Sequence, residues 1–200
     1  MKNTCIIACL MLLPLGMRAQ TLSASLGIGT GIPYWLQSRA ANGANPYQIP
    51  FSSRMEVAFH PEEGPFGLVL RFQQFEVDHY ETNGPVLTVS HLEATTTSLL
   101  LERKHRFVAW ELGYNFGIGY VNESYDQDFF ELTNRMVGYT ASGFARLSLS
   151  SRLSMDVQPT FTWQGPIRGN IHRESQIGGR DLGAFVHLGI VYLIVGKHEF

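Results

Sequence analysis

Charged residues occur in this chain at positions where most neighbours are small or apolar, and such charges can form ion pairs or transfer protons. Six lie in alternating segments, on the face opposite the large apolar side chains: Arg54, Glu56, Arg71, Glu111, Arg146 and Asp156. An unpaired buried charge is costly, so we expect these groups to neutralise one another. Counted from the ends of their segments, Glu111, Arg146 and Asp156 fall at similar heights, which predicts one paired network. A gated path for protons or ions is the alternative use.

Hydroxyl, imidazole and carboxyl groups occur together twice, and they provide the only candidates for a catalytic triad. One set is Ser90, His91 and Glu93, and the other is His172, Glu174 and Ser175. A nucleophile, its base and an orienting acid must lie within hydrogen-bond reach of one another. Both sets are weak, because adjacent strand positions point to opposite faces and loop histidines are usually solvated. We therefore expect no enzyme, and we expect His187 to be a hydrogen-bonded interior residue.

Carboxylates also gather in the segment 122–134, which predicts a long acidic loop. The acidic side chains lie beside three aromatic ones: Glu123, Asp126, Asp128 and Glu131, with Tyr125, Phe129 and Phe130. Hard oxygen ligands of this kind could bind calcium, but the glycine and spacing of an EF-hand are absent, which favours a solvated loop. No phosphate-binding glycine loop, metal-ligand spacing or nucleotide motif occurs, so we expect no cofactor and no metal.

The segment 108–120, VAWELGYNFGIGY, indicates the element that positions these groups. Large apolar and small or polar residues alternate in it without interruption, which is the period of a strand whose two faces meet different environments. At roughly 3.3 Å per residue and a tilt of about 40°, such a strand crosses the hydrocarbon layer of an outer membrane. The side chains predicted to face lipid are Trp110, Leu112, Tyr114, Phe116, Ile118, Phe161, Trp163 and Tyr192.

The same alternation predicts eight strands, with connections of alternating length. The strands are expected at about 21–29, 51–60, 66–77, 86–101, 108–120, 137–149, 153–164 and 182–194. Longer polar loops are expected at 30–50, 78–84, 122–134 and 165–180, and short turns at 61–65, 102–106 and 150–151. An even strand count with long loops at one end and short turns at the other is typical of outer-membrane barrels. Tyr34 and Trp35 are expected at the membrane interface.

In two stretches the sequence pattern does not determine which residues face inward. In the fourth strand, the run Thr95–Thr97 followed by Leu99–Leu101 satisfies either assignment of the inner face. In the third strand, Phe75 and Val77 would face inward unless a bulge near Gln73 and Gln74 resets the register. Both alternatives remain open at this level.

The first nineteen residues have the pattern of a secretory signal. Lys2 precedes an apolar stretch, and Ala19 is a small residue suited to signal-peptidase cleavage, so we predict a signal at 1–19 and a barrel domain at 20–200. Cys5 and Cys9 both lie within this signal, so no disulfide framework is expected. Two of the 15 basic residues also lie there, which leaves 13 against 17 acidic residues and gives no support for nucleic-acid binding.

From the signal end to the final segment GIVYLIVG, the chain resembles the small eight-stranded outer-membrane β-barrel proteins of Gram-negative bacteria, the porin-like superfamily. The resemblance implies an all-β, antiparallel, up-and-down transmembrane barrel in the outer membrane. It also implies membrane lipids and lipopolysaccharide as partners. Phe200 resembles the C-terminal aromatic residue by which the barrel-insertion machinery recognises its clients, although Lys197, His198 and Glu199 precede it. The oligomeric state stays open.

A secreted lipocalin-like barrel would have the same topology with the faces reversed. Its outer face would be rich in lysine, whereas the three lysines of this chain, Lys2, Lys104 and Lys197, lie outside the predicted strands. The expected role is therefore structural, or surface contact through the extracellular loops. The alternatives are a lipid A modifying enzyme and a narrow conduit, although eight strands enclose little more than their own side chains.

Overall fold

The computed structural model describes residues 19–33, 51–61, 65–83, 86–127, 130–166 and 181–196. Several predictions fall outside these ranges: the signal up to residue 18, the interfacial pair Tyr34 and Trp35, and the C-terminal Phe200. They remain predictions. No helix of the described part is long and apolar enough to span a bilayer.

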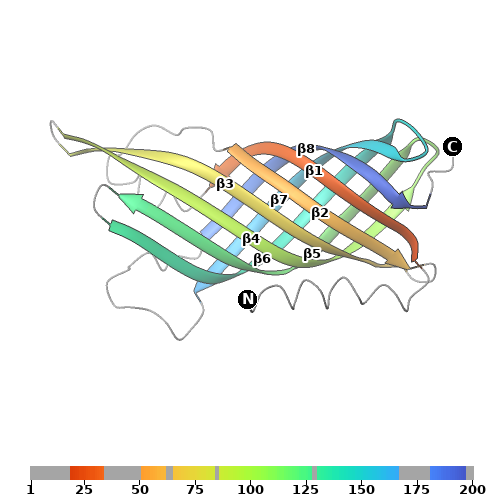
Figure 1. The fold of residues 1–200 in the computed structure, drawn as a ribbon, viewed down its shortest axis with the longest axis horizontal. Helices are drawn as coiled ribbons and strands as arrows, with labels where there is room; N and C mark the ends of the chain where they lie inside the picture. The colour runs from red at the N-terminus through yellow and green to blue at the C-terminus, as the bar shows by residue number, and fades with distance from the viewer. Residues whose placement is uncertain are drawn as a thin grey trace.

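The chain forms eight antiparallel strands that close into a barrel in the order β1 to β8, which confirms the predicted fold class (Figure 1). Each strand pairs with its neighbours in sequence, and β8 pairs with β1. The strands are β1 Ala19–Pro33, β2 Phe51–Pro61, β3 Gly67–Asn83, β4 Val86–Arg106, β5 Trp110–Gln127, β6 Phe130–Ser148, β7 Leu153–Pro166 and β8 Asp181–Val195.

The two faces of the sheet are sorted by size and polarity. On β5, Phe116 is 46 % exposed on the outside, whereas its neighbour Asn115 is 1 % exposed in the lumen. The eight side chains predicted to face lipid all point outward and are 44 % to 58 % exposed. A closed sheet has only these two faces, so the alternating sequence places its apolar half on the outer surface and its polar half in the lumen.

The structure fixes both of the uncertain phases. On β4, Leu100 is buried in the lumen while Leu99 and Leu101 are exposed outside. The ladders of β3 with β2 and β4 run past Gln73 and Gln74 with no register shift, so there is no bulge. Phe75 therefore faces inward, where its ring packs on that of Phe185 at a centroid distance of 5.4 Å.

Three of the predicted connections were wrong, because the strands are longer than their apolar pattern. Residues 102–106 continue β4, and the turn at this end comprises 107–109. The predicted loops at 78–84 and 122–134 are largely strand, since β3 continues to Asn83, β5 to Gln127, and β6 begins at Phe130. We call this extended end of the barrel the hairpin end, and the end with the turns at 107–109 and 149–152 the turn end.

Aromatic side chains form two levels on the outer surface. Tyr120, Tyr139 and Trp163 lie toward the hairpin end, where Tyr139 and Trp163 stack at 5.3 Å. Trp110 lies at the turn end of β5. From Trp110 to Tyr120 the strand rises roughly 33 Å, or about 25 Å along the barrel axis at a tilt near 40°, which matches the apolar band of an outer-membrane barrel.

Replacing Ile118 with arginine tests this apolar band. Ile118 is 58 % exposed on the outside of β5, between the two aromatic levels. Ile118 pairs with Tyr139 and lies two residues from Tyr120, nearer the edge of the band than its middle, so we expect the Ile118→Arg variant to lose about 1–2 kcal/mol of unfolding free energy in phospholipid vesicles. Urea titration of the vesicle-inserted protein measures this, and an unchanged midpoint would show that residue 118 does not face hydrocarbon.

Candidate functional site

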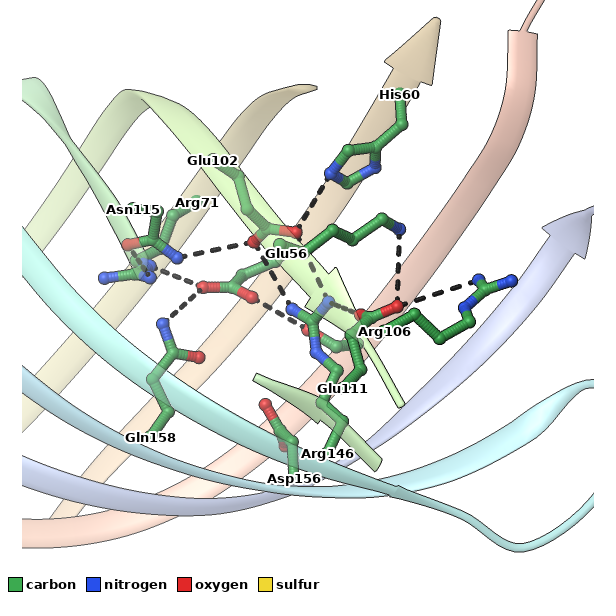
Figure 2. Close-up of polar contacts among 12 residues, drawn as sticks. Glu56, His60, Arg71, Glu102, Arg106, Glu111, Asn115, Arg146, Asp156 and Gln158 are labelled. Atoms are coloured by element: carbon green, nitrogen blue, oxygen red, sulfur yellow. Dashed lines mark hydrogen bonds and ion pairs between the residues drawn. The ribbon is translucent and has the colours of Figure 1, made fainter. Parts of the chain in front are cut away.

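The lumen contains the six charged residues expected there from the sequence and a seventh, Glu102, which belongs to a segment predicted to be a turn. All seven are almost fully buried: Arg54, Glu56, Arg71, Glu102, Glu111, Arg146 and Asp156. They come from β2 to β7, and Figure 2 shows all of them except Arg54 gathered inside the barrel. Glu102 is the residue that was missed, and continuing the alternation of β4 past Leu100 would have found it.

Arg71 lies at the centre of this lumen network. Its Nε donates to Oε1 of Glu56 at 2.6 Å, while its two terminal nitrogens donate to Ser142 Oγ at 2.8 Å and to Asn115 Oδ1 at 3.0 Å. The guanidinium plane thus joins strands β2, β3, β5 and β6 across the lumen. Such a fork of donors holds several acceptors in one fixed geometry.

Arg146 forms a second centre toward the turn end. Its Nη1 lies 2.9 Å from Glu111 Oε1 and 3.3 Å from Glu102 Oε1, and its guanidinium stacks over the Phe144 ring at 3.9 Å. His60 Nε2 approaches Glu102 at 3.2 Å. The predicted pair of Glu111 and Arg146 is therefore present, and Arg146 also contacts Glu102 and Phe144.

The predicted third member of that row has a different partner. Asp156 is the register partner of Arg146, but its carboxylate accepts from Arg54 Nη2 across the barrel at 2.8 Å. Glycines leave the room for this pair, because a Cβ at Gly189 would overlap Asp156 and one at Gly27 would lie 3.0 Å from Arg54 Nη2. Sequence alternation assigned the face correctly and could not assign the cross-barrel partner.

Toward the hairpin end the lumen becomes uncharged. His187 lies fully buried, as expected of an interior histidine, with Nε2 3.0 Å from Ser52 Oγ. Ser52 in turn donates to the Gln74 carbonyl at 3.1 Å. Phe75 and Phe185 then fill the next layer. In the described part of the chain, side chains therefore fill the lumen, with charged groups toward the turn end and aromatic rings toward the hairpin end.

The charges of the network nearly balance. Three buried arginines face four buried carboxylates, and Lys104 and Arg106 at the turn end approach Glu111 Oε2 at 3.6 and 3.7 Å. Taking charges out of water is compensated only where each has close partners and further hydrogen bonds. This arrangement joins opposite walls of the barrel, and within the described residues each charged group of the network lies within 4.0 Å of an opposite charge.

Replacing Glu111 with glutamine tests the network at its less buried end. Arg146 would keep Glu102, but Lys104 and Arg106 would lose their shared carboxylate. We expect the Glu111→Gln variant to lose about 1–3 kcal/mol of unfolding free energy. Urea unfolding monitored by tryptophan fluorescence measures the change, and a variant as stable as the parent would contradict a structural role for Glu111.

Similarity in sequence does not identify the chain: no protein-family model matches it, and no curated protein is significantly similar to it. Similarity in structure does identify the fold. Neisserial surface protein A aligns over 86 % of this chain and 94 % of its own at 8 % identity, with a TM-score of 0.55. The chain has the fold of the small eight-stranded outer-membrane barrels.

Two further barrels of this fold align as well. Ail, the attachment invasion locus protein of Yersinia pestis, was solved with the heparin analogue sucrose octasulfate, and it aligns over 89 % of this chain and all of its own at 11 % identity and a TM-score of 0.55. OprG of Pseudomonas aeruginosa aligns over 90 % and 98 % at 11 % identity and a TM-score of 0.54. At these identities the likeness establishes the fold.

Within this outer-membrane barrel fold, the candidate triads are not assembled among the described residues. His91 is exposed and Glu93 half-buried on β4, and the Glu93 carboxylate accepts a hydrogen bond from Gln74 at 3.0 Å. The side chain of Ser90 lies outside the described set, as do His172, Glu174 and Ser175. The described residues therefore do not test whether either triad forms, and both stay sequence-based candidates.

Most of the segment predicted to be an acidic, calcium-binding or solvated loop is β-strand. Residues 122–127 and 130–134 belong to the β5–β6 ladder, in which Asp126 is the register partner of Glu131, while Asp128 and Phe129 lie outside the described residues. The described residues contain no group of three or more acidic, histidine or cysteine side chains suited to a metal ion. The loop prediction was wrong for the paired positions.

Proposed function

We propose that this chain is an integral outer-membrane barrel whose role is structural or adhesive, carried out by the part of its sheet that projects beyond the membrane. The apolar outer surface supports the membrane location, because a continuous belt of exposed apolar side chains suits hydrocarbon rather than water. Phospholipid and lipopolysaccharide acyl chains are the partners of that belt, and the barrel-insertion machinery would assemble it.

The observation that carries the proposal is the projecting sheet at the hairpin end. The β2 ladder on β3 stops at the pair Phe51 and Glu76, and the β7 ladder on β6 stops at Met136 and Pro166. Strands β3 to β6 continue beyond these points as a four-stranded sheet (Figure 1). The segments 77–83 and 130–135 each pair on one side only with described residues.

An edge strand presents a row of backbone donors and acceptors, which a further extended segment can pair with. The edge at 77–83 would offer roughly 20 Å of such backbone outside the membrane. Strand pairing also holds this backbone in an extended form before a partner binds, which lowers the entropy lost on binding. Surface contact is therefore the function that this geometry supports best.

Adhesion of cells that display the protein tests this function. We expect full-length display in a Gram-negative host to increase cell-to-cell or cell-to-matrix attachment. Deleting the paired tips 79–90 and 126–131 should remove that increase while the barrel keeps its heat-modifiable migration on a denaturing gel. Equal attachment by the full-length and shortened proteins, at equal surface amounts, would refute the proposal.

The two other functions have direct tests. Because side chains fill the described lumen, we expect no regular conductance steps in planar bilayers, and steady steps would favour a conduit.

For lipid A modification, we expect the acyl pattern measured by mass spectrometry to be the same with and without the protein. A changed pattern that disappears in a His91→Ala variant would establish an enzyme in place of an adhesive role.

A further inference from the structure

The outer surface of the turn end carries basic groups with no described acidic group beside them. The last residues of β4 alternate in direction: Glu102 and Lys104 point into the lumen, and Arg103 and His105 point outward. Arg152, in the turn between β6 and β7, is exposed at the same end. The described carboxylates of this end, those of Glu102 and Glu111, are buried in the lumen.

Arg103 lies between two exposed aromatic side chains. Its guanidinium carbon is 5.9 Å from the centroid of the Phe66 ring. On its other side, Tyr114 is its direct register partner on β5, with its side chain on the same outer face. Aromatic neighbours hold a guanidinium by cation–π attraction and leave its planar set of donors available.

His105 and its surroundings continue the same surface. His105 is the register partner of Leu112, which is 45 % exposed, and Phe107 in the following turn is 56 % exposed. Basic or hydrogen-bonding groups thus alternate with apolar ones at the edge of the apolar band. This combination suits a ligand that has a phosphate at one end and acyl chains at the other.

We propose that Arg103 and His105, with Phe66 and Tyr114 beside them, form a binding site for the phosphate of anionic phospholipids in the periplasmic leaflet. The inference rests on the proposed membrane location, which puts the turn end in the periplasm. The Arg103 guanidinium donates to the phosphate oxygens, His105 supplies a further donor, and the exposed rings and Leu112 contact the acyl chains.

Charge complementarity selects this ligand. A phosphate brings a full negative charge to a rim whose described outward charges are positive, and it lies at the depth of the interfacial aromatic residues. A carboxylate polymer such as the peptidoglycan peptide would meet the same charges, but it would make no use of the apolar neighbours. Competition between the two ligands is therefore included in the test.

Native mass spectrometry of the purified full-length barrel tests the site, with phosphatidylglycerol and phosphatidylcholine as probes. We expect the parent to retain phosphatidylglycerol preferentially. Arg103→Gln should lower the retained fraction about fivefold, as expected for one basic residue near a lipid surface. Arg103→Gln with His105→Gln should abolish the preference. The matched control is Arg135→Gln, which removes an exposed arginine near the hairpin end and should leave the preference unchanged.

The outcomes separate this inference from the proposed membrane location. Equal retention of both lipids by the parent, or an equal loss in Arg103→Gln and Arg135→Gln, would overturn the site while the barrel still floats with vesicles. Displacement of the bound lipid by a soluble peptidoglycan peptide would also overturn it, in favour of that polymer. A protein that floats with no vesicle of either composition would instead overturn the membrane proposal itself.

Discussion

Replacing Arg146 with leucine should lower the free energy of unfolding by about 3–5 kcal/mol, since the change leaves buried carboxylates without their cation. Arg146 is the hydrogen-bond partner of both Glu102 and Glu111, and its guanidinium also stacks on Phe144. Urea titration in phospholipid vesicles, monitored by tryptophan fluorescence, measures the change.

Two companion variants make this result specific. Arg146→Lys keeps the charge and loses the forked geometry, so it should fall between the parent and the leucine variant. Arg106→Gln removes a cation whose side chain is 36 % exposed and 3.7 Å from Glu111, and it should change stability by less than about 1 kcal/mol. If Arg146→Leu unfolds at the same urea concentration as the parent, the lumen network does not stabilise the barrel.

The second large effect on stability is expected at the pair of Arg54 and Asp156, where a second substitution should reverse the loss caused by the first. Asp156→Leu leaves Arg54 buried with its next carboxylate, that of Glu56, 3.8 Å away, and should lose about 3–5 kcal/mol. Adding Arg54→Leu removes the orphaned charge, so the double variant should recover most of that loss.

The same urea titration applied to the parent, both single variants and the double variant measures the coupling. A matched pair for comparison is Ser52 with His187, whose hydrogen bond joins two uncharged groups and should show coupling of only about 1 kcal/mol. Simple additivity of the two losses at Arg54 and Asp156 would contradict a direct pair across the lumen.

The fold could be predicted because successive strand residues point to opposite faces of a sheet, and the two faces of a closed barrel meet different environments. Asn115 is buried in the lumen while its neighbour Phe116 is exposed on the outer surface, so the alternation of size and polarity corresponds to the two faces of the closed sheet. Inner and outer faces were therefore assigned correctly wherever the apolar residues alternate, on β5, β7 and β8 above all.

The strand ends could not be predicted for the same reason. Beyond the apolar band the large apolar residues no longer alternate along the sequence, so the paired segments 78–83 and 122–127 have the composition of loops. At the turn end, the four consecutive polar residues 103–106 had the composition of a turn, although they alternate between lumen and outer surface.

Partners across the lumen are the part of the site that no local pattern encodes. The distance of 2.8 Å between Arg54 and Asp156 depends on how the closed barrel brings β2 opposite β7, and on the space left at Gly27 and Gly189. Phe75 shows the same limit, because the ring that packs on it, that of Phe185, lies on β8, and no local pattern brings the two rings together.

Cysteine labelling on intact cells tests the central claim, a lumen-filled barrel in the outer membrane with its projecting sheet outside. The only cysteines of the chain, Cys5 and Cys9, lie in the predicted signal, so the parent should remain unlabelled after export. With a membrane-impermeant maleimide, His91→Cys on the projecting part of β4 should react, and Ser142→Cys in the filled lumen should not. Reaction at residue 142 together with silence at residue 91 would contradict the account.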